Sequence, residues 1–159
     1  MFFGEYTRHL DSKGRIMIPA EYREEIGDIL YVVVGFDKNL MLLKPEDYNK
    51  FYRYISTLNF MDPDARTMRR LFMAKAKQLP LDASNRIRIP SDLLELIGFE
   101  PGTSVVLAGN GSYLEIWTEQ RWAEFNHSLI EGDLSQERFA KFSIIFNDAP
   151  TDEDQPALF

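Results

Sequence analysis

Apolar and polar stretches alternate along the chain in a way that divides it into short strands and helices. Two uninterrupted β-branched runs, ILYVVVGF at 29–36 and SVVLAGN at 104–110, have the length and composition of buried strands. Turn residues follow each run, and the next apolar stretches, LMLL at 40–43 and YLEIW at 113–117, are predicted to return as the second strands. The pattern therefore predicts two similar hairpins.

Each predicted hairpin is followed by apolar residues at helical spacing: Tyr48, Phe51, Ile55 and Leu58 in the first case, and Trp122, Phe125 and Leu129 in the second. Such a single stripe is typical of core or subunit packing. Thr118 is the expected N-cap of the second helix. A connecting helix is predicted between the two halves, with Asp62 as its N-cap and Pro63 at its first position.

A ten-residue motif also occurs twice. LDSKGRIMIP at 10–19 returns as LDASNRIRIP at 81–90, with six of the ten positions identical. A short predicted helix follows each copy, AEYREEIG at 20–27 and SDLLELIG at 91–98, and each ends at a glycine. The chain is therefore predicted to be an internal duplication.

One half is too small to cover its own sheet, so two copies are expected to interlock about a pseudo-two-fold axis and share one barrel-like core. The predicted fold class is α+β, built from tandem duplicated β/α units. The first repeat with the connecting helix is placed at 1–72 and the second repeat with a C-terminal helix at 73–146. Residues 147–159 form an acidic, proline-bearing tail that is expected to lack fixed structure.

The repeated motif reads as a tight loop that leads into a strand. Gly14 and Asn85 occupy equivalent positions, and both residue types tolerate left-handed backbone angles. At the start of each loop, Asp11 or Asp82 is expected to accept backbone N–H groups and to pair with the arginine four residues later, Arg15 or Arg86. Asp11, Asp82, Gly14 and Asn85 are thus the predicted loop-bracing residues.

Two interpretations of these loops stay open on spacing alone. The Asp–Arg pairs would staple two hairpins, or they would aim planar guanidinium groups at an anion such as a phosphate or a guanine edge. Exposed ion pairs stabilise a fold by only about 0 to 1 kcal/mol, so stapling alone is a weak reason for two arginines at these positions. Lys13 and Arg88 would add charge to the same loops or serve as ordinary solvated charges.

Composition changes this picture in one respect. The net charge of −7 at pH 7 argues against an anionic partner, but residues 131–159 hold seven acids and two bases and so account for −5 of it. The rest of the chain carries only −2, with its bases clustered near the two loops and in the connecting helix. An acidic chain can therefore still present a basic face.

Other classes of protein find little support. The chain contains no cysteine, no signal peptide pattern and no apolar run long enough for a membrane helix, which together favour a soluble cytoplasmic protein. A carboxylate dyad of Asp11 and Asp82 would need a shared proton, whereas the neighbouring arginines would keep both ionised. His9 and His127 have no clustered acids at ligand spacing, and no phosphate-binding glycine motif is present. We therefore expect no enzyme, no metal and no cofactor.

The chain resembles the MraZ family, which is related to the AbrB-type swapped-hairpin transcription factors. The resemblance rests on LDSKGRIMIPAEYRE, LDASNRIRIP, the helix MDPDARTMRRL and the final L-E-I-W run, and it covers about residues 1–146. It implies a nucleoid-associated regulator of the division and cell-wall gene cluster, which assembles as a ring and binds direct repeats upstream of its own operon.

By this resemblance, Asp11 with Arg15 and Asp82 with Arg86 match the two family motifs. Double-stranded DNA and further copies of the chain are the implied partners, and Arg15, Arg86, Lys13 and Arg88 are the candidate DNA-binding residues. The second loop lacks the lysine and glycine of the first, so the two loops need not act equally. The alternative function is an oligomeric protein-interaction scaffold in which the Asp/Arg loops are purely structural.

Overall fold

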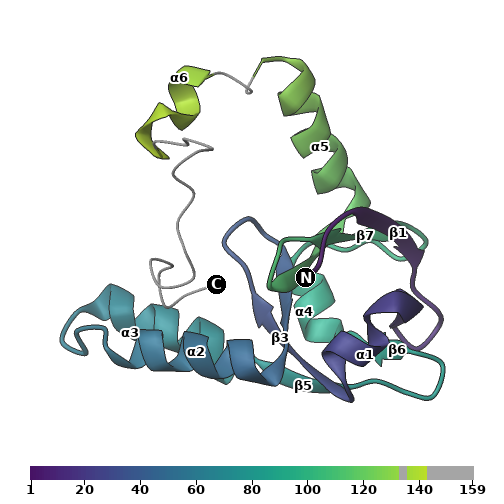
Figure 1. Cartoon of the computed structure of the whole chain (residues 1–159), viewed down its shortest axis with the longest axis horizontal. Coiled ribbons are helices and arrows are strands. Elements are labelled where there is room, and N and C mark those ends of the chain that lie inside the picture. Colours follow the sequence, from purple (N-terminus) through teal and green to yellow (C-terminus); the bar gives the residue numbers. More distant parts are fainter. Residues whose placement is uncertain (133–135, 143–159) are drawn as a thin grey trace.

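The computed structural model describes residues 1–132 and 136–142. Its centre is a six-stranded antiparallel sheet, in the order β1 (Glu5–His9), β7 (Ser104–Gly109), β8 (Tyr113–Thr118), β4 (Leu40–Leu43), β3 (Ile29–Val34) and β5 (Lys77–Pro80). Both predicted hairpins are present, as β3–β4 and β7–β8 (Figure 1). Their second strands, β4 and β8, pair with each other and join the two halves at the middle of the sheet.

The halves also exchange their outer strands. β1 precedes the first motif but pairs with β7 of the second half, and β5 precedes the second motif but pairs with β3 of the first half. The expected interlocked duplication is thus confirmed. The sheet is open and not a closed barrel, because β1 and β5 stand at its two edges and the chain leaves each edge for a separate two-stranded ribbon.

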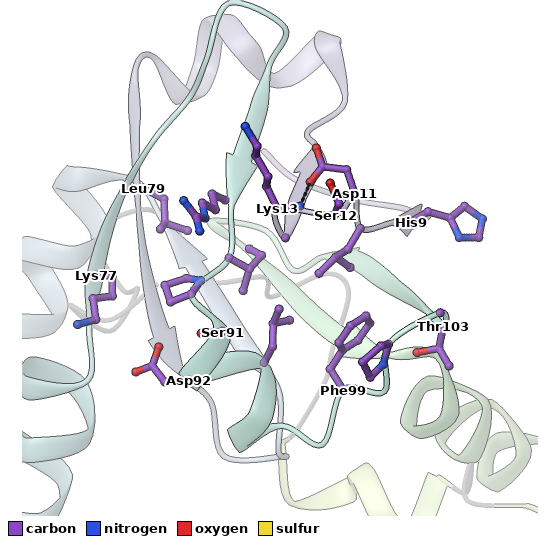
Figure 2. A pocket seen from close by; sticks show the side chains of 18 of the residues that line it. His9, Asp11, Ser12, Lys13, Lys77, Leu79, Ser91, Asp92, Phe99 and Thr103 are labelled. Atoms are coloured by element: carbon purple, nitrogen blue, oxygen red, sulfur yellow. Dashed lines mark hydrogen bonds between the residues drawn. The ribbon is translucent and has the colours of Figure 1, made fainter.

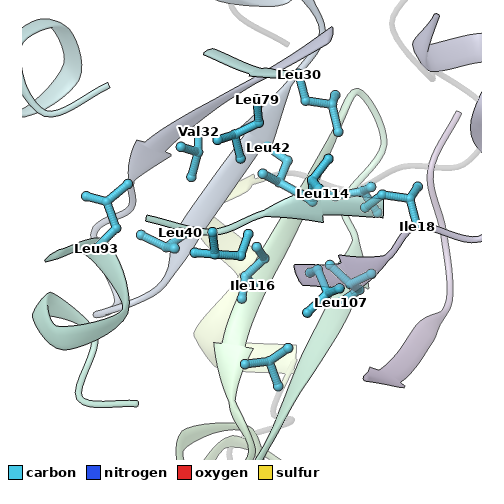
Figure 3. Packing of buried hydrophobic residues seen from close by; sticks show 14 of the residues in the cluster. Ile18, Leu30, Val32, Leu40, Leu42, Leu79, Leu93, Leu107, Leu114 and Ile116 are labelled. Carbon is cyan, nitrogen blue, oxygen red and sulfur yellow. The ribbon is translucent and has the colours of Figure 1, made fainter. Parts of the chain in front are cut away.

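The apolar runs are uninterrupted because β3 and β4 are covered on both faces. Leu30, Val32, Leu40 and Leu42 face the main core, where they meet Leu107, Leu114 and Ile116 (Figure 3). The alternate positions Val33, Met41 and Leu43 face a second cluster under the helices of the first half. A strand buried on both sides has no polar face to show in its sequence.

The helices begin largely where their capping residues predict. The Asp62 carboxylate accepts the backbone N–H of Asp64, and Thr118 Oγ1 accepts that of Arg121. The helical segments are η1 (Ala20–Tyr22), α1 (Arg23–Ile26), α2 (Pro45–Ser56), α3 (Pro63–Arg69), the π-helical turn η2 (Arg70–Ala74), α4 (Ser91–Leu96), α5 (Glu119–Ile130), α6 (Gln136–Phe139) and η3 (Ala140–Phe142).

The two long amphipathic helices differ in their surroundings. In α2, Phe51 and Ile55 are buried, and the Phe51 ring meets Phe72 of η2 edge-to-face at 4.6 Å between centroids. In α5 no residue is buried, and Phe125 is 41% exposed. Figure 1 shows α5 extending away from the sheet. The stripe of α2 therefore packs within the chain, whereas that of α5 stays largely uncovered.

The predicted acidic tail, residues 147–159, lies outside the described residues. Among those that are described, no helix is both long and apolar enough to cross a membrane.

Candidate nucleic-acid interface

The two repeated motifs lie side by side as a small ribbon separate from the main sheet. Its strands, β2 (Arg15–Met17) and β6 (Arg86–Arg88), are antiparallel, and Ile16 stands opposite Ile87 at the centre. Both isoleucines are 1% exposed and belong to the main core. Because side chains alternate along a strand, the flanking positions of both strands lie on the outer face. There Arg15 is opposite Arg88, and Met17 is opposite Arg86.

The ribbon continues into both loops through backbone bonds. The N–H of Ile18 donates to the Asn85 carbonyl at 2.8 Å, and the N–H of Ile89 donates to the Gly14 carbonyl at 2.9 Å. Each loop therefore lies against the end of the opposite motif. The sequence showed that the loop recurs, and the structure places the two copies together.

In the first loop, the Asp11 carboxylate accepts hydrogen bonds from residues on the far side of the turn. Its Oδ1 accepts the backbone N–H groups of Lys13 and Arg15, both at 2.9 Å, and its Oδ2 accepts Arg15 Nε at 2.6 Å. Gly14 has a φ of 77°, and a Cβ at that residue would lie 3.2 Å from the Ile89 carbonyl oxygen. A glycine therefore suits both the turn and the close approach.

The second loop repeats this geometry with different residues. Asp82 Oδ1 accepts the N–H groups of Ser84 and Arg86 at 2.9 Å, and Oδ2 accepts Arg86 Nε at 2.9 Å. Asn85 adopts a φ of 60° in place of the glycine. The two backbones are thus equivalent, although the second loop has Ser84 where the first has Lys13.

These contacts keep both carboxylates ionised. The backbone N–H of Arg15, followed by its guanidinium and the N–H of Lys13, lowers the pKa of Asp11 from 3.8 to about 2. The backbone N–H of Arg86, with that of Ser84 and the Arg86 guanidinium, lowers the pKa of Asp82. Two permanently charged carboxylates are poor candidates for proton-transfer chemistry at neutral pH.

The arginine heads are held but not covered. The side chains of Arg15 and Arg86 are 31% and 32% exposed, and each uses Nε for its aspartate. Arg86 Nη1 also lies 3.9 Å from Asp11 Oδ2, which links the two loops electrostatically. Lys13 and Arg88 form no ion pair within the described part of the chain, so their charges are uncompensated there.

Two further basic residues support the ribbon and were not singled out from the sequence. Arg8 of β1 donates through Nε to the Met17 carbonyl at 3.0 Å. Arg23 of α1 donates through Nη1 to the Asp82 carbonyl at 3.0 Å and to Asn85 Oδ1 at 3.3 Å. The sequence marks Arg23 as a position where the two repeats differ, since the equivalent residue in the second half is Leu94.

Other candidate sites are weaker. His9 Nδ1 lies 3.1 Å from Ser104 Oγ, which gives that ring a structural partner. Across residues 1–132 and 136–142, no three histidine or acidic side chains are grouped as a metal site would need. In the basic connecting helix α3, Arg66 is engaged with the Phe60 and Met61 carbonyls, and α3 lies at the end of the molecule opposite the ribbon (Figure 1).

Comparison with known proteins gives a consistent result. A family model described as "MraZ protein, putative antitoxin-like" matches twice, at residues 1–71 and 72–143. The chain is 37% identical to a protein named transcriptional regulator MraZ from Dictyoglomus thermophilum, over 79% of this chain and 85% of that protein. A protein of the same name from Caldanaerobacter subterraneus is 34% identical, over 92% of this chain and 99% of that protein.

A third relative with this name, from Syntrophomonas wolfei, is 35% identical over 80% of this chain and 88% of its own length. The tandem family match agrees with the interlocked repeats of the fold, and these relatives are named as regulators and not as enzymes. The chain belongs to the MraZ family.

Proposed function

We propose that this protein is a sequence-specific, DNA-binding transcriptional regulator of the division and cell-wall gene cluster. It binds direct repeats upstream of its own operon as a ring-shaped oligomer, and it acts in the cytoplasm in association with the nucleoid. The observation that carries the DNA-binding part is the paired ribbon β2–β6, whose outer face bears Arg15, Arg86 and Arg88. The names of the relatives support the regulatory part.

A two-stranded antiparallel ribbon is one of the few elements that fit the DNA major groove. Three arginines on one face offer planar donors for guanine edges or phosphates, and Lys13 adds a point charge beside them. The aspartate braces fix Arg15 and Arg86 before binding, so less side-chain entropy is lost when DNA is contacted.

Self-association would compensate for the small size of one ribbon. The aromatic residues Trp122 and Phe125 of α5 are packed together at 5.1 Å between ring centroids, yet Phe125 remains 41% exposed. The apolar face of the equivalent helix α2 is covered by η2. The apolar face of α5 has no such covering element within the described chain. An assembly built through α5 would repeat the ribbons and gain avidity on a repeated operator.

Fluorescence anisotropy with the DNA upstream of the protein's own gene tests this function. Arg15→Ala and Arg86→Ala should each weaken binding by roughly tenfold or more, as expected for an arginine that contacts a base or is pre-positioned on phosphate. Arg53→Ala, which removes the same charge from an exposed position on α2, is the matched control and should bind like the wild type. Because the loop ion pairs are partly exposed, the thermal melts of both loop variants should stay close to the wild type.

Two controls separate specific recognition from general attraction. The logarithm of affinity should fall with the logarithm of salt concentration, with a slope of about −0.9 per neutralised phosphate. A scrambled duplex of the same length should bind more weakly at every salt concentration. Equal binding of the scrambled duplex, or full affinity in both arginine variants, would contradict the proposal.

The alternative is an oligomeric interaction scaffold whose Asp/Arg loops only staple the ribbon. The exposed aromatic face of α5 favours this alternative, because an exposed apolar face can bind another protein. The same variants distinguish the two functions. A scaffold would show no operator binding, and Arg15→Ala or Arg86→Ala would destabilise the fold without affecting any DNA complex.

A further inference from the structure

A cavity of about 900 Å³ opens beside the first arginine loop. Ligand pockets typically enclose roughly 300 to 1,000 Å³, so this cavity is large enough for a small organic molecule. Its wall runs from the loop of Asp11 to Gly14 across β5 to α4 and the turn before β7. Figure 2 shows Lys13 and Lys77 at different edges of it and Phe99 on the far side, while the His9 ring points away.

The cavity marks a difference between the repeats. On the second loop, the equivalent position is occupied by Arg23, which donates to the Asp82 carbonyl and Asn85 Oδ1 and is anchored by Asp28 at 3.3 Å. On the first loop, the residues equivalent to Arg23 and Asp28 are Leu94 and Phe99, 71 positions later in each case. The Arg23–Asp28 pair that supports the second loop is therefore replaced at the first loop by two apolar side chains, which leave space beside that loop.

The lining combines an apolar wall with a basic rim. The apolar part comprises Leu10, Leu79, Ile89, Leu94 and Phe99. The basic part comprises Lys13, Lys77 and Arg88, which form no ion pair in the portion of the chain that the structure describes. Of the acids at the cavity, Asp11 is neutralised by Arg15, which leaves Asp92 as the opposing charge. Charge complementarity thus favours an anion with an apolar body.

We propose that this cavity binds a small amphipathic anion, namely an apolar or aromatic body that carries a sulfonate, carboxylate or phosphate group. The body packs on Leu94 and Phe99, and the anionic group is attracted by the basic rim that Lys13, Lys77 and Arg88 form. Since Lys13 and Arg88 belong to the proposed DNA-contacting set, an occupied cavity lowers DNA affinity. This regulatory part rests on the proposed function, whereas the binding part does not.

Titration with 8-anilinonaphthalene-1-sulfonate, followed by its fluorescence, tests the binding part. The neutral analogue N-phenyl-1-naphthylamine has the same rings without the sulfonate and should bind more weakly. Lys77→Ala should weaken sulfonate binding roughly two- to fivefold, as expected for one exposed charge pair. Lys75→Ala, an exposed lysine two residues away that does not line the cavity, is the matched control and should have no effect.

A second variant fills the cavity with the arginine–aspartate pair of the other repeat. Leu94→Arg combined with Phe99→Asp copies the Arg23–Asp28 pair and should weaken sulfonate binding about tenfold or more, through loss of apolar contact and of space. Circular dichroism confirms that this double variant folds; if it does not, the result for Lys77→Ala decides. Equal binding of the neutral analogue, together with unchanged affinity in Lys77→Ala, overturns the proposed site.

The regulatory part is measured by repeating the operator titration at saturating sulfonate. The apparent DNA affinity should fall about fivefold or more in the wild type and should not change in the Leu94→Arg/Phe99→Asp variant. Unchanged DNA affinity in the wild type overturns the regulatory part. If the protein binds no DNA even without the probe, the proposed function fails, and the sulfonate titration still decides the cavity.

Discussion

Gly14 adopts a left-handed backbone conformation in the first arginine loop, which is unfavourable for other residues. Replacing it should therefore lower the stability of the protein by a measurable amount. The φ of Gly14 is 77°, and an added Cβ would lie 3.2 Å from the Ile89 carbonyl oxygen. A left-handed conformation costs a non-glycine residue about 1 to 2 kcal/mol, and the close approach moves Gly14→Ala toward the upper end. For a domain of this size, that corresponds to a melting temperature lower by roughly 2 to 8 °C.

Two other variants separate the causes. Gly98→Ala has nearly the same φ, 76°, but its Cβ would meet nothing within 4 Å, so it reports the conformational cost alone. Gly14→Asn should be milder than Gly14→Ala, since Asn85 already holds the equivalent position at a φ of 60°. The assay is thermal unfolding by circular dichroism at one protein concentration, so that any assembly affects all variants equally. A Gly14→Ala protein that melts like the wild type would refute this account of the loop.

Three further predictions concern acid, packing and the tail. Because the pKa of Asp11 is lowered to about 2, its contribution to stability is present above about pH 4 and lost as the pH falls toward 2; the difference in melting temperature between wild type and Asp11→Asn should therefore shrink over that interval. Phe51→Ala should cost about 3 to 5 kcal/mol in urea unfolding, whereas Phe125→Ala, on the uncovered helix, should cost far less and instead reduce the assembly size in light scattering. Removal of residues 147–159 deletes four acids and no base, so operator affinity in the anisotropy assay should rise at low salt and converge with the wild type at high salt.

Much of the local structure was visible in the sequence because its causes are local. The caps at Asp62 and Thr118 act within a few residues, and the β-branched runs at 29–36 and 104–110 needed only a hydrophobic environment to form strands. The duplication was visible as well, since a repeated loop leaves repeated letters. The predicted barrel-like closure was less accurate, because the fate of an edge strand depends on where the chain goes next, and here both edges lead into the ribbon.

The candidate site required tertiary structure for a different reason. The spacing of Asp11 and Arg15 placed both in one loop, but nothing in either motif indicated that Ile16 would lie opposite Ile87 and bring the two loops onto one face. The cavity beside the first loop was equally hidden, because it arises from a missing contact.

By itself, the sequence determined the repeated unit, the two hairpins, the amphipathic helices after them and the chemistry of each loop, all of which depend on residues near one another in the chain. Only the tertiary structure decided which strands are exchanged between the halves, that α5 lacks the cover that α2 has, and that Arg23 fills a space which Leu94 leaves open. Those outcomes depend on contacts between residues that are far apart in the chain, where packing and not local preference selects the partner.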